Sequence, residues 1–320
     1  MQRAFVFPGQ GSQKVGMGQD LAQAFTAARE VFEEVDEALG EQLSATIFNG
    51  PDEELRLTRN TQPALMAMSM AVIRVIEHES GQKIGSLAAA MAGHSLGEYS
   101  ALAAAGAISL EDTARLLRLR GDAMQRAVPV GQGAMTALLG ADLAVAEEIA
   151  TEAAESAGDP ASAEVCTLAN DNAPGQVVLS GSKAAIDRAV ALAGEKGVRK
   201  AVLLPVSAPF HCPLMAPAAE TMATALTNVD IRRPLIPVFA NVSARPAQEP
   251  DEIRDLLVRQ VTAMVRWREC VAAMAGEGVE LLVESGAGNV LKSLTRRIDR
   301  ELDAVSVGGV EDIENFLKSL

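Results

Sequence analysis

A chain of 320 residues is long enough for about two folding units, or for one large unit that carries an insertion. Its 42 acidic and 28 basic side chains give a formal net charge of −14, which argues against binding nucleic acid or anionic lipid through the whole surface. Aromatic residues make up only 3% of the chain, too few for a base-stacking nucleic-acid module. We therefore expect a globular protein that binds neither nucleic acid nor membrane.

The cysteines and the apolar runs indicate the compartment. Cys166, Cys212 and Cys270 are odd in number and far apart, which excludes a closed disulfide framework and any CxxC metal or redox pair. The apolar run before Pro8 is too short for the core of a signal peptide, and no stretch approaches the ~18 uncharged apolar residues that span a bilayer. We expect a cytoplasmic protein with no metal and no cofactor.

In chain order, the first half alternates between strands and helices. Residues 4–7 form an apolar run that ends at a Pro-Gly pair, which is typical of a buried first strand. Residues 21–39 repeat apolar side chains every three to four positions before a glycine, which predicts one amphipathic helix. A second helix is expected to open at Pro63. A third runs through the arginines of residues 115–120 and is expected to end at Gly121.

The second half contains an insertion. Residues 134–204 read as strand, helix, two strands, helix and strand, which is the ferredoxin-like order. Alternation then resumes with a strand at 236–240, a helix at 253–275 and a strand at 279–284. The prediction is an α/β fold: a hydrolase-like core with a parallel sheet, formed by residues 1–130 and 205–320, and a ferredoxin-like small subdomain formed by residues 131–204.

Residues 93–97, Gly-His-Ser-Leu-Gly, form a G-x-S-x-G pattern between an apolar run and a helix-like run. A strand-turn-helix of this kind is a nucleophile elbow, which pushes the serine hydroxyl to the tip of a strained turn. Glycines are needed because side chains two residues either side of the serine would collide with neighbouring backbone. The N–H of Leu96 would lie at a helix N-terminus, where partial positive charge favours an oxyanion. We predict that Ser95 is a nucleophile; a plain glycine-flanked turn is the alternative.

A serine nucleophile needs a base, and the chain has three histidines. His94 neighbours the serine and is expected to point elsewhere, and His78 lies in a polar helix end that favours a solvated role. His211 follows a strand and is bracketed by prolines, at the place where a hydrolase-like layout puts the base. Elimination favours His211; a structural histidine is the alternative.

Two further segments carry candidate binding groups. The loop of residues 7–13 lacks the lysine of a P-loop and the third glycine of a dinucleotide fingerprint. It is either a mere turn or a means of bringing the N–H of Gln10 to a reacting carbonyl. Arg120 is either a solvated helix-end charge or a buried guanidinium that clamps a substrate carboxylate through two hydrogen bonds.

Together these segments resemble one family, the bacterial malonyl-CoA:acyl carrier protein transacylases and the related acyltransferase domains of polyketide and type I fatty acid synthases. The matches occur in family order and span nearly the whole chain: FPGQGSQ (7–13), TQPALMA (61–67), GHSLGEYSAL (93–102), LRLRGDAMQ (117–125), NDNAPGQVVLSG (170–181), SAPFHCPLM (207–215), ANVSA (240–244) and ESGAGNVL (284–291). The last segment lacks the proline and lysine often seen in the family, so we assign no carrier or CoA contact to Asn289.

The resemblance implies a Ser-His dyad without a third acidic member. Ser95 would accept the acyl group, His211 would be its general base, and the N–H groups of Gln10 and Leu96 would form the oxyanion hole. A malonyl-serine ester would form from malonyl-CoA and pass to the phosphopantetheine thiol of acyl carrier protein, which gives ping-pong kinetics.

Substrate selection is also implied by the resemblance. Arg120 would pair with the free carboxylate of malonate, a charge-assisted contact of about 1.5–3 kcal/mol that acetyl groups lack. Phe210 matches the malonyl-selecting version of its loop, and the backbone carbonyl of Gln260 would hold the tautomer of His211.

The expected partners are malonyl-CoA and holo acyl carrier protein in fatty acid synthesis, with the chain as a monomer. Because the net charge is unfavourable for docking an acidic carrier, we expect basic residues near the pocket mouth to contact it: Lys292, Arg296 and Arg297. The alternatives are a polyketide-pathway malonyltransferase, a serine thioesterase or esterase, and a non-catalytic carrier-binding subunit.

Overall fold

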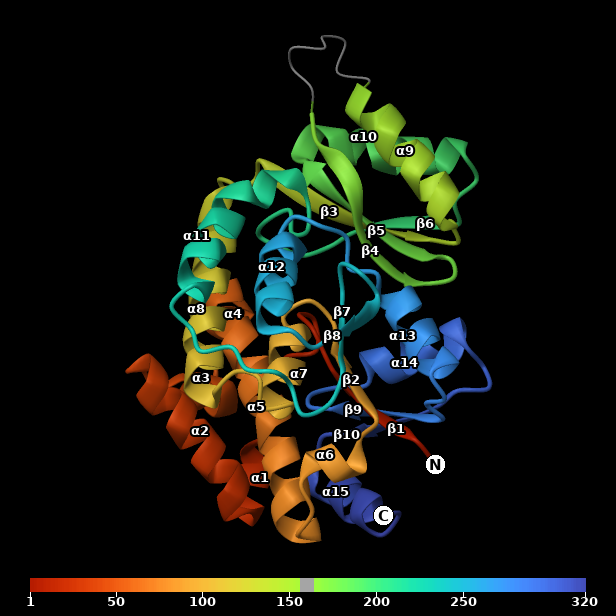
Figure 1. Cartoon of the computed structure of the whole chain (residues 1–320). Coiled ribbons are helices and arrows are strands. Elements are labelled where there is room, and N and C mark those ends of the chain that lie inside the picture. Colours follow the sequence, from red (N-terminus) through yellow and green to blue (C-terminus); the bar gives the residue numbers. More distant parts are fainter. Residues whose placement is uncertain (156–163) are drawn as a thin grey trace.

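The computed structural model describes residues 1–155 and 164–320. Two sheets organise them, a six-stranded one and a four-stranded one above it in Figure 1. The strands are β1 (Arg3–Phe7), β2 (Ala90–Gly93), β3 (Gly133–Leu139), β4 (Cys166–Ala173), β5 (Gln176–Ser182), β6 (Lys200–Leu203), β7 (Val238–Ala240), β8 (Arg245–Ala247), β9 (Leu281–Ser285) and β10 (Asp303–Val307).

The helices of the described residues cover both sheets (Figure 1). They are α1 (Gln19–Ala24), α2 (Thr26–Leu39), α3 (Leu43–Asn49), α4 (Asp52–Arg56), α5 (Thr58–Ser80), α6 (Ile84–Leu87), α7 (Gly97–Ala104), α8 (Leu110–Ala127), α9 (Leu143–Glu155), α10 (Lys183–Glu195), the 3₁₀ helix Pro213–Met215, α11 (Ala216–Leu226), α12 (Pro250–Gln260), α13 (Trp267–Gly276), α14 (Val290–Ile298) and α15 (Val310–Leu317).

The large sheet has the order β10-β9-β1-β2-β7-β8, and all its neighbouring strands are parallel except β7 and β8. The side chains of β1, in the middle of this sheet, point alternately into two apolar cores. Phe5 and Phe7 pack into the larger cluster, whereas Ala4 and Val6 pack into a second cluster that contains Trp267 of α13. Burial on both faces explains why β1 is an unbroken apolar run in the sequence.

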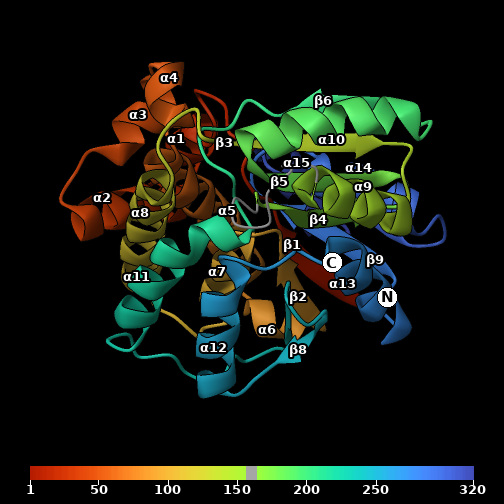
Figure 2. The ribbon, with the colours of Figure 1, turned by 90° about the horizontal axis from the view of Figure 1, so that it is seen from above.

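The small sheet confirms the ferredoxin-like order predicted from the sequence. It has the order β4-β5-β3-β6 with every pair antiparallel, and α9 and α10 pack over it (Figure 2). Its core is formed largely by alanine, valine, leucine and isoleucine side chains of these strands and helices.

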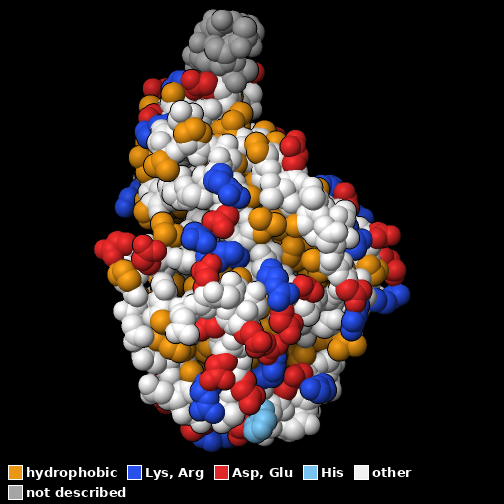
Figure 3. All heavy atoms as spheres, turned by 90° about the vertical axis from the view of Figure 1, so that its left-hand side faces the viewer, with side chains coloured by type: hydrophobic (Ala, Val, Ile, Leu, Met, Phe, Trp, Pro, Cys, Tyr) orange, Lys and Arg blue, Asp and Glu red, His pale blue; other side chains and the backbone are white. Residues whose placement is uncertain are grey.

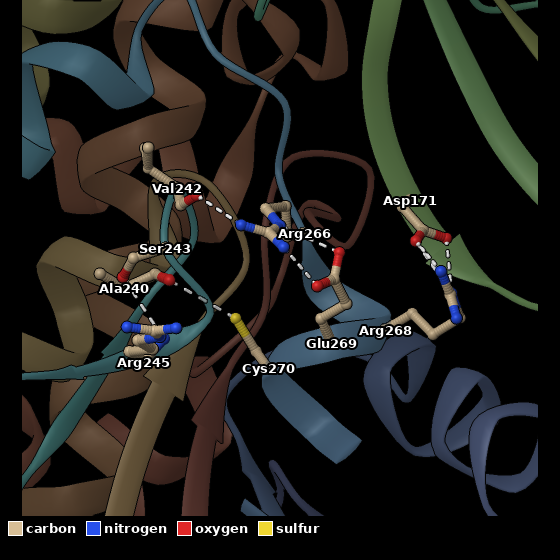
Figure 4. A network of polar contacts seen from close by, with 9 residues as sticks. All are labelled: Asp171, Ala240, Val242, Ser243, Arg245, Arg266, Arg268, Glu269 and Cys270. Atoms are coloured by element: carbon tan, nitrogen blue, oxygen red, sulfur yellow. Dashed lines mark hydrogen bonds and ion pairs between the residues drawn. The ribbon is translucent and has the colours of Figure 1, made fainter. Parts of the chain in front are cut away.

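Strand β4 attaches the small sheet to the rest of the molecule. The N–H of Asp171 donates to the carbonyl of Val265 at 2.9 Å, and the N–H of Val265 donates to the carbonyl of Ala169 at 2.9 Å. The buried carboxylate of Asp171 also pairs with Arg268 of α13 at 2.7 Å, as Figure 4 shows. These contacts hold β4 against the segment that follows α12, close to the elbow.

Two helices of the first half differ from the sequence prediction. Residues 21–39 form two helices rather than one, because Phe25 is extended and separates α1 from α2. Helix α5 begins at Thr58, before Pro63. Because a proline has no N–H to offer the carbonyl of Arg59, that carbonyl instead accepts a hydrogen bond from Arg118 at 2.8 Å.

The predictions that Gly121 ends a helix and that residues 253–275 form one helix were also wrong. Helix α8 continues to Ala127, and a Cβ at Gly121 would lie 2.6 Å from the Cα of Arg59, so glycine permits close packing of α8 on α5. Helices α12 and α13 are separated because Val265 bonds to β4 instead of to a helical neighbour.

Charged side chains are prominent on the face of the molecule shown in Figure 3. Acidic and basic side chains are interspersed over the face that carries α2, α8 and α11 (Figure 3). Within residues 1–155 and 164–320, no helix combines the length and the apolar character that crossing a bilayer requires.

Candidate active site

The G-x-S-x-G segment forms a strained turn between β2 and α7. Ser95 has a φ of 54°, in the left-handed region that non-glycine residues rarely adopt. A Cβ at Gly93 would lie 1.8 Å from the carbonyl carbon of Gly97, and a Cβ at Gly97 would lie 2.2 Å from the carbonyl oxygen of Phe7. Both glycines are therefore required by neighbouring backbone, and the serine hydroxyl is presented at the carboxyl end of a parallel strand.

His211 lies against this hydroxyl although the two residues are 116 positions apart in the chain. Its Nε2 is 2.7 Å from the Oγ of Ser95, and its Nδ1 is 2.9 Å from the backbone carbonyl of Gln260. Because a carbonyl only accepts, Nδ1 carries the proton and Nε2 is free to accept the serine proton. Burial, together with the positive charge of Arg120, lowers the pKa of His211 to about 3, so the ring is neutral at neutral pH.

Arg120 is buried and faces the same hydroxyl. Its Nη1 donates to Oε1 of Gln62 at 2.7 Å, and its Nη2 donates to Oε1 of Gln260 at 2.9 Å and to Oγ of Ser95 at 3.2 Å. All three acceptors are uncharged. The arrangement presents a guanidinium, the side chain best suited to a carboxylate, directly beside a nucleophile.

A layer of buried polar groups supports the elbow, and the sequence analysis did not identify it. Asn241, at the end of β7, accepts the N–H of Ser95 at 2.8 Å and donates to the carbonyl of Gly93 at 2.7 Å. Its own N–H donates to Oε2 of Glu98 at 3.0 Å, and Gln260 donates to the same atom at 2.7 Å. The available signal was Glu98 itself, the one charged residue of α7.

A cavity of about 240 Å³ opens beside the dyad. Ser95, His211, Arg120, Gln10 and Phe210 all line it, together with Gly11, Gln13, Arg56, Gln62, His94, Met124, Met135, Asn170, Leu204, Pro205 and Val206. No carboxylate is among these lining groups. The electrostatic environment of the cavity therefore favours an anionic acyl group, because the charged side chains that line it are Arg56 and Arg120.

The two proposed oxyanion donors are placed differently. Gln10 lines the cavity, whereas the side chain of Leu96 is buried and its backbone caps α7. Within the described part of the chain, neither backbone N–H has a hydrogen-bond partner. Both are thus free to donate to an incoming oxygen.

The other histidines have other partners, although His94 also lines the cavity, and the basic residues expected near it lie elsewhere. His94 bonds through Nε2 to Oδ1 of Asn172 at 2.8 Å, and His78 is exposed and pairs with Glu79. The basic residues expected near the pocket mouth do not line this cavity: Lys292, Arg296 and Arg297. Arg56 of α4 does, and the sequence analysis missed it. No cluster of metal-ligating side chains is found among the residues that the structure describes.

Comparisons with known proteins agree with this site. Residues 4–309 match the family described as acyl transferase domain. The malonyl CoA-acyl carrier protein transacylase of Haemophilus influenzae is 46% identical over 317 residues, which cover 98% of each protein. The structure of an acyl-carrier-protein-S-malonyltransferase from Bartonella henselae is 53% identical, with a TM-score of 0.95 over 100% of this chain and 99% of that one.

A third relative is a malonyl-transacylase solved in complex with its type II PKS acyl-carrier protein. It is 42% identical to the chain, with a TM-score of 0.94 and full coverage of both chains. Identity of this extent over full length is sufficient to assign the family. The chain therefore belongs to the acyl transferase family, among the malonyl CoA-acyl carrier protein transacylases.

Proposed function

We propose that this protein transfers a malonyl group from CoA to the phosphopantetheine thiol of acyl carrier protein through an ester on Ser95. The observation that carries the proposal is one hydroxyl shared by two groups. His211 lies 2.7 Å from the Oγ of Ser95 and Arg120 lies 3.2 Å from it. A base activates the oxygen while a guanidinium beside it receives the free carboxylate of the acyl group.

In the first half-reaction the neutral His211 accepts the proton of Ser95 as the Oγ attacks the thioester carbonyl. The carbonyl of Gln260 stabilises the imidazolium that forms, because it already accepts the hydrogen bond of Nδ1–H. The free N–H groups of Gln10 and Leu96 receive the oxyanion. His211 then protonates the departing CoA thiolate, and a malonyl-serine ester is left.

The second half-reaction reverses these steps. The thiol of the carrier gives its proton to His211 and attacks the ester carbonyl, and the same N–H groups hold the oxyanion. Collapse returns the proton to the Oγ of Ser95 and releases the malonyl thioester. Because CoA leaves before the carrier attacks, ping-pong kinetics are expected.

Selection of the acyl group rests on Arg120 and Phe210. A malonyl carboxylate completes a charge-assisted pair with the buried guanidinium, whereas an acetyl group leaves the guanidinium with neutral partners only. Phe210 lines the cavity and reduces the space for a branched acyl chain. Arg120 thus favours malonyl over acetyl groups, and Phe210 favours malonyl over methylmalonyl groups.

Incubation with malonyl-CoA and holo carrier tests the proposal against the alternatives. Transfer to the carrier supports it, release of free malonate indicates a thioesterase, and neither product indicates a binding subunit. Because one similar structure holds a type II PKS acyl-carrier protein, carriers of fatty acid and of polyketide synthesis are compared in the same assay. We expect the fatty acid carrier to be the better acceptor by kcat/KM.

A cytoplasmic location is part of the same proposal. The thiols of Cys166, Cys212 and Cys270 are all free and buried, which suits a reducing compartment. Fractionation of cells that express the tagged chain is the test, and recovery with the periplasmic or membrane fraction would oppose it.

A further inference from the structure

Glu98 is a buried carboxylate that neither half-reaction uses. It lies in the first turn of α7, three residues after Ser95, and only 3% of its surface is exposed. Its Oε2 accepts hydrogen bonds from the N–H of Asn241 and from Nε2 of Gln260, both uncharged groups. Burying a carboxylate with neutral partners is costly, so a role other than stability is expected.

The amide of Gln260 connects this carboxylate to the guanidinium. Its Nε2 donates to Glu98 at 2.7 Å and, at the longer distance of 3.0 Å, to the carbonyl of Ser95, and its Oε1 accepts from Nη2 of Arg120 at 2.9 Å. A carboxylate only accepts hydrogen bonds and a guanidinium only donates them. The amide can therefore satisfy both neighbours in one orientation alone, because a reversed amide would set NH₂ against the guanidinium and oxygen against the carboxylate.

This orientation decides where the guanidinium points. Oε1 of Gln62 holds Nη1 of Arg120 and Oε1 of Gln260 holds Nη2. Between these two acceptors, Nη2 reaches the Oγ of Ser95 at 3.2 Å. A turned Gln260 amide would remove one of the two supports and allow the guanidinium to rotate away from the acyl group.

We propose that Glu98 is a positioning residue for acyl-group selection: its carboxylate fixes the amide of Gln260, and this amide aims Arg120 at the free carboxylate of the acyl group. The inference rests on the proposed function, because it concerns how the same site distinguishes a malonyl from an acetyl group. Glu98 itself touches no reacting atom.

The surroundings of Glu98 make its positioning of Gln260 and Arg120 dependent on pH. Burial raises the pKa of Glu98 to about 7, against the hydrogen bonds from Asn241 and Gln260 and the charge of Arg120 on α8. The charge of Glu98 acts in turn on Tyr99 of α7 and Cys270 of α13; burial raises the pKa of both, so both are neutral near pH 7. A protonated Glu98 loses the charge that strengthens the hydrogen bond from Nε2 of Gln260, so it holds the amide less firmly, and the carbonyl of Ser95, at 3.0 Å from the same Nε2, is then the main acceptor.

The test compares rates of Ser95 acylation by malonyl-CoA and by acetyl-CoA, without carrier, in the wild type and in Glu98→Gln. The variant has the same shape, cannot ionise, and carries both a donor and an acceptor. We expect the malonyl-to-acetyl rate ratio to fall about tenfold at pH 8 in the variant and to stay constant from pH 6 to pH 8. The wild-type ratio should fall toward the variant's value at pH 6.

Glu284→Gln is the matched control. Glu284 is also buried, and its carboxylate accepts the N–H groups of Leu291 and Lys292 at the start of α14, outside the cavity. The wild-type ratio at pH 8 should be retained in this variant. An unchanged ratio in Glu98→Gln at pH 8, or a wild-type ratio that is constant from pH 6 to pH 8, would overturn the inference. A wild type that forms no malonyl ester would instead refute the proposed function.

Discussion

Replacement of Arg120 by methionine separates acyl-group selection from the chemistry of the dyad. Methionine keeps an apolar stem in the same space but removes the guanidinium, and a charge-assisted pair with a carboxylate is worth about 1.5–3 kcal/mol. At 1.4 kcal/mol for each factor of ten, malonyl acylation should fall about 10–150-fold relative to acetyl acylation. The oxygens Oε1 of Gln62 and Oε1 of Gln260 also lose a donor, so the variant should unfold at a lower temperature.

The assay is single-turnover formation of the Ser95 ester at subsaturating malonyl-CoA or acetyl-CoA, followed by intact mass. Arg118→Met is the control, because Arg118 lies on the same helix, bonds to the carbonyl of Arg59 and pairs with Glu41, but does not line the cavity. This control should lose stability and keep the malonyl-to-acetyl ratio. Equal losses of malonyl and acetyl acylation in Arg120→Met would refute the selection role.

Gly97→Ala should lower the unfolding temperature, because the new Cβ would lie 2.2 Å from the carbonyl oxygen of Phe7 and overpacking of this kind costs about 1–3 kcal/mol. Gly194→Ala is the control: no atom lies within 4 Å of its new Cβ, so its unfolding temperature should not fall. The acetyl acylation rate should stay level from pH 8 to pH 5, because burial lowers the pKa of His211 to about 3; an inflection near 6.5 would contradict this. The stability of Glu98→Gln relative to wild type should rise by about 3 kcal/mol from pH 4 to pH 9. Burial raises the pKa of Glu98 from 4.5 for a solvated side chain to about 7, so the stability of the wild type falls as pH rises through that window. Urea unfolding at a series of pH values measures the difference, and a constant difference would count against it.

Local sequence patterns predicted two kinds of element. Some are bounded by glycine or proline, and the others have an apolar pattern that shows which of their faces is buried. The strand-helix order of residues 134–204 was enough for the ferredoxin-like sheet, and the apolar run before Gly93 was enough for β2 and the elbow. In these segments the backbone pattern and the packing favour the same structure, so sequence reasoning succeeds.

Boundaries set by distant partners were not predictable in this way. Pro63 reads as a helix start, yet α5 begins earlier because Arg118 satisfies the carbonyl that the proline cannot. Gly121 reads as a helix end, yet it is the place where α8 approaches α5. In both cases a contact across about sixty residues of chain overrides the local signal.

The residues of the candidate site also fall into those that local sequence predicts and those that it does not. Ser95 has a motif and His211 was reached by elimination among three histidines, and the structure brings the two side chains together. Asn241 and Gln62 have no local signature, and Glu98 has only that of an acid in an otherwise uncharged helix, because their function lies in hydrogen bonds to residues far along the chain. Such support layers are visible only when partners in space are known.

Mass spectrometry of the intact protein after brief exposure to malonyl-CoA examines the serine ester itself. One added malonyl group should appear, map to the peptide that contains Ser95, and disappear on addition of holo carrier. Ser95→Ala should remain unmodified. A malonyl group that persists on Ser95→Ala, or a wild-type protein whose mass does not change, would show that the nucleophile lies elsewhere or that the chain does not carry out this transfer.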